Sequence, residues 1–443
     1  MGILMGKINK LSLPLLIMVA LTSQAVWAGP TERAMAKRIH DRLTGVTATN
    51  AAIDDMERTL DCTLPALPGY PCDPSGKNAA LYAIDTADNP NARYFYNVTL
   101  KNYVAPWTNE EQTVFTPLND YTATAIGLIR DGLDFRRILY DDILYVGNNA
   151  PAYDNSNNNH YAALEALNPA TTGDLSNPAI LQPTTQTSVR PGIPAAGIMT
   201  SRAGAMAFYS AGTNRAMFRF TLMNHLCTDL EPLKDVSRSS EKVRRDVSRS
   251  PGGDSRLYLN GCVGCHAGMD GMAGAFAYYE WDSAAGRMLY QDTGNAALFE
   301  VDPASPSFGV SLKHNINENN FEYGHITDDD SWINFWRNGP NSKLGLRPAD
   351  DGPSATGWGA LTNPDSKGNE TGNGARSLGI ELSNSKAFAQ CQVDKAFKSI
   401  CLRDPNIFAA DRSARDGFVS NFVGNGYNMR EVFTDVAAYC KGS

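Results

Sequence analysis

The sequence predicts a mainly α fold, with helical regions towards both ends of the mature chain and long loops. Apolar residues recur at helical spacing in residues 30–60, as at Met35 and Ile39, and the pattern returns in 200–227 and 377–440. Segments rich in Asn, Pro, Thr or Gly separate these stretches. The alternation therefore favours helices joined by long surface loops.

The first 28 residues have the pattern of a secretory signal peptide. Lys7 and Lys10 precede an apolar core at 11–21, and residues 26–28 (Val-Trp-Ala) form a small-residue cleavage site. This apolar core is too short to span a bilayer, and no second hydrophobic segment follows. We therefore expect a periplasmic, extracellular or cell-surface protein with no integral membrane segment in its mature chain.

Composition narrows the possible functions. Removal of residues 1–28 takes the formal charge from −8 to −10, because that segment contains two lysines and no acidic residue. A net negative charge disfavours nucleic acid as a partner. A hydrophobic content of 42% with 9% aromatic residues is ordinary for a globular protein, and no Ser/His/Asp or P-loop pattern is recognisable.

Changes in composition divide the chain after the signal peptide. Asn-rich residues 148–160 and Pro- and Thr-rich residues 169–194 predict surface loops. Three aspartates at 328–330 predict the start of a short helix over 331–337. The expected parts are a helical N-terminal region (29–232), a basic connector (233–256), a central module (257–340), a Gly/Asn/Pro-rich loop (341–376) and a helical C-terminal module (377–443). The connector is expected to be solvated, with a docking face for an acidic redox partner as the alternative.

The central module contains the most specific motif, Cys262-Val263-Gly264-Cys265-His266. Two cysteines three residues apart and a following histidine are the signature of covalent c-type haem attachment. On a helix, positions i and i+3 face the same side, so both thiols can reach one edge of the porphyrin. We therefore expect one covalent haem c, with His266 as the proximal iron ligand. Tyr258 holds the place of the aromatic residue that packs on the porphyrin in small c-type cytochromes.

Three other interpretations of these residues were weighed. A thioredoxin-like redox pair needs a strand before the motif and leaves the histidine incidental. A zinc ribbon needs a second cysteine or histidine pair, and no other cysteines lie three residues apart. A plain disulfide between Cys262 and Cys265 leaves His266 unexplained. Haem attachment accounts for all three residues.

Six cysteines remain for disulfides, an even number that suits an oxidising compartment. Cys62 and Cys72 bracket a turn-rich loop and are expected to pair. The residues between Cys391 and Cys401 predict helix, which would separate their Cα atoms by about 15 Å, whereas a disulfide needs less than about 7 Å. Each of these two cysteines is therefore expected to bond to Cys227 or Cys440.

The sixth iron ligand is open. Met269 and Met272 lie too close in sequence to His266 to reach the opposite face of the ring. His325 and His314 lie far enough downstream, and His325 is the preferred candidate. Met223, Met288 and Met429 are further alternatives. Aromatic residues are expected to wall the haem pocket: Tyr258, Phe276, Tyr279 and Trp281.

Residues 262–282 resemble the haem module of the planctomycete-type cytochrome c family, whose members are modular extracytoplasmic haem proteins. The attachment motif and Asp270, four residues beyond His266, match in place. Gly271 stands where the family has proline, and the following aromatic and acidic residues arrive two positions late. The loop beyond Asp270 is therefore expected to have a different shape. Residues 141–146, 200–204, 226–227 and 426–431 are similar to flanking segments of the family.

The resemblance implies a largely helical extracytoplasmic haem protein, with a cytochrome c-like module at 257–340, and implies little about its reaction. We expect a mono-haem c-type cytochrome that transfers electrons to or from a redox protein or a small redox molecule. A haem peroxidase or oxidase with an open sixth position is the first alternative. A haem-stabilised cell-surface binding protein is the second.

Overall fold

The computed structural model describes residues 31–209, 213–315, 323–337, 344–345 and 371–442. Helices account for 51% of the structure and strands for 8%, so the expectation of a mainly α fold is confirmed. The α-helices are α1 (Glu32–Thr44), α2 (Asn50–Leu60), α3 (Lys77–Ile84), α4 (Lys101–Val104), α5 (Asp120–Arg130), α6 (Asn159–Ala166), α7 (Gln186–Val189), α8 (Arg202–Phe208), α9 (Arg215–Thr221), α10 (Ser255–Gly261), α11 (Val263–Ala273), α12 (Gly374–Ser383), α13 (Lys386–Cys401), α14 (Ala409–Gly424) and α15 (Met429–Tyr439).

Short 3₁₀ and π turns join many of these helices. They are η1 (Pro90–Ala92), η2 (Phe95–Leu100), η3 (Ala105–Thr108), η4 (Phe135–Leu139), η5 (Leu222–Leu226), η6 (Glu231–Leu233), η7 (Pro251–Gly253), η8 (Gly274–Phe276), η9 (Leu312–Asn315) and η11 (Phe335–Arg337). The strands are β1 (Leu144–Gly147), β2 (Leu181–Thr184), β3 (Tyr279–Asp282), β4 (Arg287–Tyr290), β5 (Ser331–Ile333) and β6 (Thr371–Asn373). They pair antiparallel as β1–β2, β3–β4 and β5–β6.

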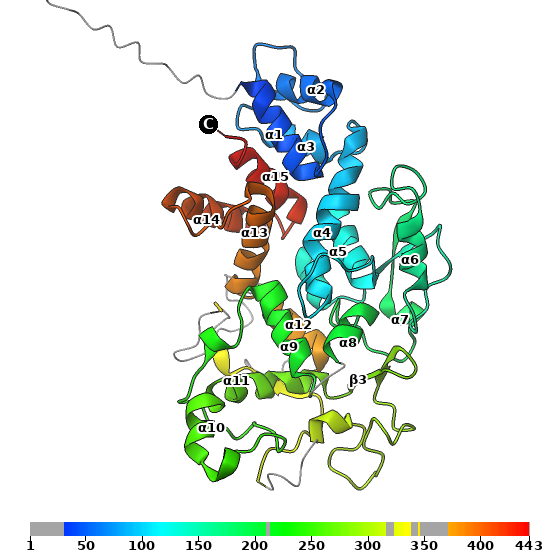
Figure 1. Cartoon of the computed structure of the whole chain (residues 1–443), viewed down its shortest axis with the longest axis vertical. Coiled ribbons are helices and arrows are strands. Elements are labelled where there is room, and N and C mark those ends of the chain that lie inside the picture. Colours follow the sequence, from blue (N-terminus) through cyan, green and yellow to red (C-terminus); the bar gives the residue numbers. More distant parts are fainter. Residues whose placement is uncertain (1–30, 210–212, 316–322, 338–343, 346–370, 443) are drawn as a thin grey trace, which may run out of the picture.

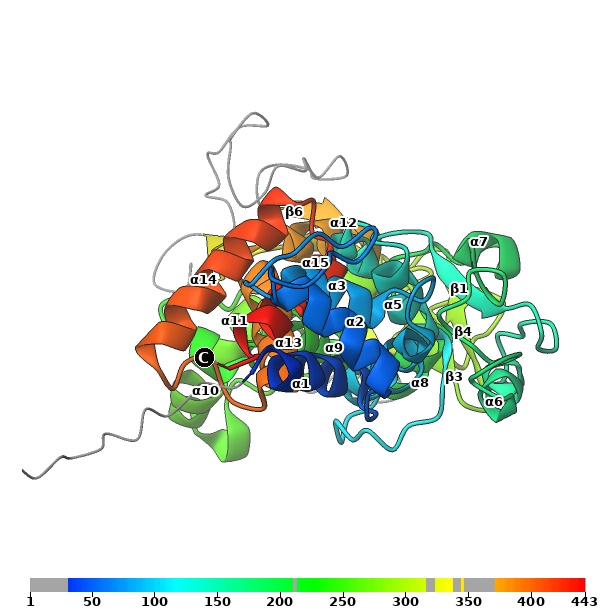
Figure 2. The same ribbon diagram turned by 90° about the horizontal axis from the view of Figure 1, so that it is seen from above.

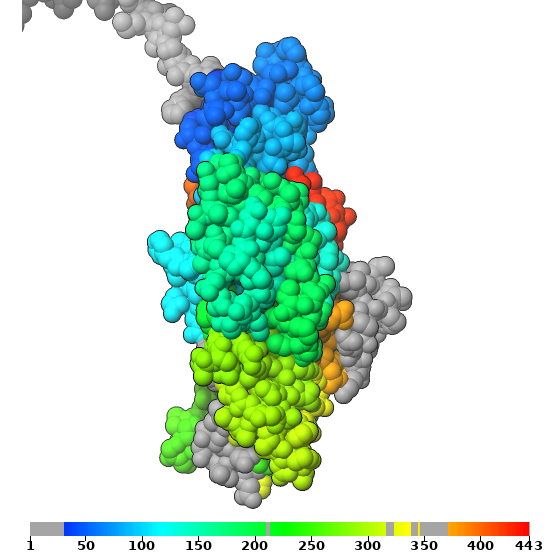
Figure 3. Space-filling model, turned by 90° about the vertical axis from the view of Figure 1, so that its right-hand side faces the viewer, coloured from blue at the N-terminus to red at the C-terminus, as the bar shows by residue number. Residues whose placement is uncertain are grey.

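The molecule is longer than it is wide (Figures 1 and 3). Helices α1, α2 and α3 lie at one end, and α10 and α11 lie at the other (Figure 1). The C-terminal helices α13, α14 and α15 run beside the N-terminal ones, as the view from above also shows (Figure 2). The two termini of the described chain therefore meet at the end that is remote from α11.

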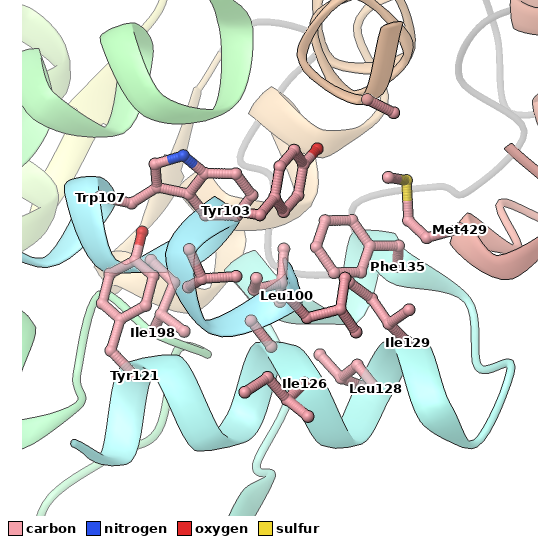
Figure 4. Packing of buried hydrophobic residues seen from close by; sticks show 14 of the residues in the cluster. Leu100, Tyr103, Trp107, Tyr121, Ile126, Leu128, Ile129, Phe135, Ile198 and Met429 are labelled. Atoms are coloured by element: carbon pink, nitrogen blue, oxygen red, sulfur yellow. The ribbon is translucent and has the colours of Figure 1, made fainter. Parts of the chain in front are cut away.

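Helix α5 lies inside the main core. Asn119 caps it by accepting a hydrogen bond from the backbone N–H of Thr122 at 3.0 Å. Every residue from Asp120 to Arg130 is buried, and its apolar side chains pack among residues of η2, α4, η3, η4 and α15 (Figure 4). A helix that is covered on all sides belongs to the interior of a large core, so α5 connects the N-terminal and C-terminal parts of the chain.

Polar contacts hold the C-terminal helix on the N-terminal ones. Arg42 of α1 donates to the backbone carbonyl of Cys440 at 2.9 Å. Lys77 of α3 forms an ion pair with Asp435 of α15 at 2.8 Å. These contacts join residues that lie more than 350 positions apart in the sequence.

The cysteine pairing agrees with the sequence-based expectations. Cys62 bonds to Cys72, and α13 is helical over Lys386–Cys401, so Cys391 and Cys401 do not bond to each other. Instead, Cys227 bonds to Cys391 and Cys401 to Cys440, with Cα–Cα distances of 5.2 and 5.5 Å. Three disulfides are compatible with an exported protein.

Two local predictions were wrong. Residues 331–333 form strand β5 instead of the first turn of a helix, because they pair with β6. β6 is too far along the chain for the local sequence pattern to reveal this pairing. Residues 169–194, expected to be a loop, contain β2, which pairs with β1, and the short helix α7. In both cases a distant segment supplies hydrogen bonds that the local composition does not reveal.

Some expectations concern residues outside the described ones. The predicted signal peptide at 1–28 and most of the predicted loop at 341–376 are among them. Among the described residues, none of the helices combines the length and the apolar character that crossing a membrane requires.

The disulfides should differ in their contribution to stability. Cys401–Cys440 closes a loop of 39 residues and Cys62–Cys72 one of 10, which correspond to about 4 and about 3 kcal/mol in the chain-entropy relation. Replacing both cysteines of the longer loop by alanine should therefore lower the urea midpoint more than the same change at Cys62 and Cys72. The opposite order, measured by circular dichroism, would contradict loop entropy as the cause.

Candidate functional site

The motif Cys262–His266 lies where α10 meets α11, at the end of the molecule remote from the termini (Figure 1). Asp254 caps α10 by accepting from the N–H of Arg256 at 2.9 Å. Helical hydrogen bonding continues through the junction with α11, since Cys262 N donates to Tyr258 O at 2.9 Å and His266 N donates to Cys262 O at 3.1 Å. Cys262 therefore stands at the junction of the two helices, one turn before Cys265 and His266 in the first turn of α11.

Cys262 and Cys265 are the two unpaired cysteines of the chain, and both are half-buried. Cys262 packs beside a small second hydrophobic cluster made of Val243, Tyr258, Val263 and Ala267. Tyr258, the residue predicted to pack on the porphyrin, is therefore buried in the cluster that Cys262 contacts. Cys265, in the first turn of α11, has its thiol 3.9 Å from the carbonyl oxygen of Leu230.

His266 is hydrogen-bonded to the next turn of its own helix. Its Nδ1 lies 3.2 Å from Oδ2 of Asp270, and 22% of the His266 side chain is exposed. An ionised carboxylate only accepts hydrogen bonds, so Nδ1 of His266 carries a proton and donates it to Asp270. None of the described residues is hydrogen-bonded to Nε2 of His266. A histidine oriented by a carboxylate in this way is the usual arrangement of a metal-ligating imidazole.

Asp270 is fully buried but stays charged. Arg215 of α9 grips it with two hydrogen bonds, from Nε at 2.7 Å and from Nη2 at 2.9 Å. Burial alone raises the pKa of Asp270, but the charge of Arg215, the hydrogen bond from His266 and the charge of Arg244 outweigh burial and hold the pKa well below its usual range. The carboxylate beside His266 is therefore an anion at any physiological pH.

Two further charged residues complete this network. Arg215 also pairs with Asp246, whose Oδ1 lies 2.9 Å from Nη2. Arg244 is 1% exposed and lies 3.8 Å from Asp270. Burial and the neighbouring charge of Arg215 lower the pKa of Arg244 to about 10, so it remains a cation near neutral pH. The expectation of a solvated basic connector over 233–256 is wrong at Val243 and Arg244, which are both buried.

Arg244 is hydrogen-bonded to His314, another candidate for the sixth ligand. Arg244 Nη1 lies 2.5 Å from Nδ1 of His314, and a guanidinium can only donate, so this nitrogen accepts. The other ring nitrogen faces the side-chain amide of Asn214 at 3.4 Å. Burial, followed by the charge of Arg244, lowers the pKa of His314 well below its ordinary value. His314 is held as a neutral core residue and offers no free lone pair for iron.

His325 lies close to the motif helix. Its backbone N–H donates to the carbonyl of Val243 at 3.0 Å. Its side chain lines a cavity of about 260 Å³ that Asp270 also lines, together with residues of β5 and β6. Burial and the charge of Lys242 lower the pKa of His325, which favours the neutral form that ligates metals. The structure therefore places the preferred sixth-ligand candidate on the same cavity as Asp270, the partner of His266.

The methionine candidates are less available. Met269, Met272, Met288 and Met429 are buried in the main core. Met429 lies beside Phe135 in this core (Figure 4). Met223 is partly buried against the same core.

The predicted aromatic wall is wrong as a single surface. Tyr258 belongs to the small second cluster, whereas Phe276, Tyr279 and Trp281 belong to the main core. Tyr279 stacks on Tyr209 with ring centroids 5.8 Å apart. The turn and hairpin that follow α11 carry these three side chains away from Tyr258 into the core.

Glycines let other elements lie directly on α11. A Cβ at Gly268 would stand 2.4 Å from the ring of Trp336, and one at Gly271 would stand 3.0 Å from the carbonyl oxygen of Ile333. α11 continues through Asp270 to Ala273, so the expectation of a loop there is wrong. Gly271 stands where the family that this segment resembles has proline. Glycine is compatible with this helix, whereas proline in a helix interior removes a hydrogen bond and clashes.

The sequence reasoning missed Arg215, Arg244 and Asp246. Arg215 lies on a helix outside the motif module, and the other two lie in the segment expected to be solvated. The only sequence signal was Asp270 itself, because a carboxylate on a buried helix requires a positive partner.

Comparisons with protein-family models, with curated proteins and with solved structures found no match for this chain. Any proposal about the function of this chain therefore depends on the site described above.

The contact between α11 and Trp336 should be sensitive to a single methyl group. Gly268→Ala forces that ring to move and should cost about 1–3 kcal/mol by overpacking. Gly261→Ala in α10 is the matched control, since nothing lies within 4 Å of its added Cβ, and alanine favours helix. Urea denaturation of both variants would test this, and equal midpoints would contradict the close packing.

Proposed function

We propose that this chain is an extracytoplasmic mono-haem c-type cytochrome that transfers electrons. The observation that carries the proposal is the pair of free thiols at the start of α11, Cys262 just before the helix and Cys265 in its first turn, followed by a histidine whose Nδ1 is held by Asp270. When bound, haem c would supply an iron that accepts and returns one electron. The resemblance to the planctomycete-type cytochrome c family stays a prediction and agrees with this proposal.

The residues present fit such a group. Cys262 and Cys265 would hold it covalently, and both are partly exposed. His266 would bind the iron through Nε2, because Nδ1 is engaged by Asp270. Tyr258 and the second hydrophobic cluster would offer apolar surface beside the first thiol. His325 is the candidate for the sixth position, because it lies beside the motif helix and is held neutral.

The cysteine inventory supports an exported protein. Six cysteines form three disulfides, while the two of the attachment motif remain apart. In an oxidising compartment, two thiols that stay free require a reason. Use of both sulfurs in thioether bonds is such a reason.

A haem peroxidase or oxidase is the second candidate. The observation that favours it is the hydrogen bond from His266 to a fully ionised carboxylate, because such a partner strengthens the imidazole as a donor to iron. The cavity beside Asp270 and His325 would admit a small molecule to this region. The third possibility, a haem-stabilised cell-surface binding protein, stays a prediction.

Covalent attachment is the first test. The chain, expressed in a host with c-type maturation machinery, should carry one haem whose mass survives denaturation. Replacing Cys262 and Cys265 together by serine should abolish that mass, and replacing Cys62 and Cys72 should leave it. Intact-protein mass spectrometry would measure all three, and a wild-type mass equal to the bare polypeptide would overturn the proposal.

Ligation at the sixth position separates the two candidate activities. The ferric electron carrier should be low-spin and react slowly with hydrogen peroxide, because a fixed ligand must first leave. His325→Ala should convert the optical spectrum to high-spin. Thr371→Val is the matched control on the same cavity wall and should leave the spectrum unchanged. A high-spin wild type with rapid peroxide turnover would instead establish the peroxidase.

A further inference from the structure

Asp270 accepts hydrogen bonds from two donors at once. One is Nδ1 of His266, at 3.2 Å from Oδ2 and 3.4 Å from Oδ1. The other is Arg215, which reaches both oxygens, with distances of 2.7 and 2.9 Å. The shorter contacts belong to the arginine, so the guanidinium takes the larger share of the carboxylate's charge.

Arg215 is itself divided between two carboxylates. Its Nη1 and Nη2 bond to Asp246, whose side chain is 8% exposed. Asp270 is 0% exposed and Arg215 is 18% exposed. A chain of bonds therefore runs from His266 through Asp270 and Arg215 to Asp246. Because water is largely excluded, each charge in this chain acts strongly on its neighbour.

We propose that Arg215 is a positioning residue that limits how strongly Asp270 polarises His266 and so sets the reduction potential of the bound haem. The inference rests on the proposed function, which supplies the haem. A carboxylate engaged by a guanidinium accepts a weaker hydrogen bond from imidazole. His266 then donates less charge to the iron, and the ferrous state is less disfavoured.

The residue that would adjust the reduction potential lies on α9, a helix outside the attachment motif. Arg215 opens α9, 47 positions before Cys262, and reaches α11 only through tertiary packing. Asp246 works against Arg215 from the segment between the two helices, since it draws the guanidinium away from Asp270. The two residues should therefore shift the potential in opposite directions.

The experiment is a redox titration of the haem-loaded full chain, in which a mediator supplies one electron to ferric iron. Arg215→Gln should lower the equilibrium constant for reduction about tenfold, or about 59 mV for one electron. Asp246→Asn should raise that equilibrium constant. This variant retains Arg215, so it still tests the inference if Arg215→Gln fails to fold. Arg219→Gln is the matched control, because Arg219 lies on the same helix in an exposed pair with Asp229, and it should change nothing.

A double-variant cycle separates positioning from a simple field effect. Asp270→Asn keeps an acceptor for His266 but removes the charge, and should raise the potential. In that background, Arg215→Gln and Asp246→Asn should lose most of their effect, because both act through Asp270. Additive shifts, or no shift from either variant in the wild-type background, would overturn the inference while leaving the proposed function intact. A wild type without covalent haem, shown by mass spectrometry, would overturn both.

Discussion

A carboxylate buried without solvent, Asp270, is the constraint that organises the motif end of this molecule. An ionised group in that position is tolerated only where cations and hydrogen-bond donors surround it. Arg215, Arg244 and His266 supply them from three separate segments. Removing one partner from a buried pair typically costs about 3–5 kcal/mol, so α9, the segment around Arg244 and α11 are held in one relative arrangement.

Two sides of α11 have different contacts. One side carries Cys265, the imidazole of His266 and, one turn further on, the buried carboxylate of Asp270 that His266 contacts. The other is lined by glycines, where Trp336 and β5 lie against the helix backbone. This close approach places the 325–333 segment, with His325, along the same helix. Packing on the glycine side and charge pairing on the carboxylate side therefore cooperate to position the candidate ligands.

The same hydrogen bond makes both candidate activities chemically reasonable. A histidine held by a carboxylate is fixed in its tautomer and orientation, which suits an electron carrier, and is a strong donor, which suits a peroxidase. Arg215 moderates that donation by engaging the carboxylate, and so favours the carrier. The occupant of the sixth position is the remaining difference between the two candidates, and His325, whose pKa is lowered by burial, is the preferred histidine for it.

The sequence by itself determined the features that depend on local spacing. Helical periodicity placed Cys262, Cys265 and His266 together, since residues three and four apart are neighbours on any helix. The length of α13 excluded a bond between Cys391 and Cys401 and left two pairings with Cys227 and Cys440, of which the structure contains Cys227–Cys391 and Cys401–Cys440. These results needed no knowledge of which segments meet.

Only the tertiary structure decided which distant residues surround the motif. Arg215 and Arg244 became partners of Asp270 because helices far apart in sequence pack together, and a basic residue carries no local sign of burial. Phe276 and Tyr279 were assigned to the wrong surface for the same reason, since aromatic side chains suit a pocket and a core equally. Strand β5 formed because β6 supplied its hydrogen bonds from 40 residues away. In each case the deciding energy comes from contacts between segments, which a single chain segment does not encode.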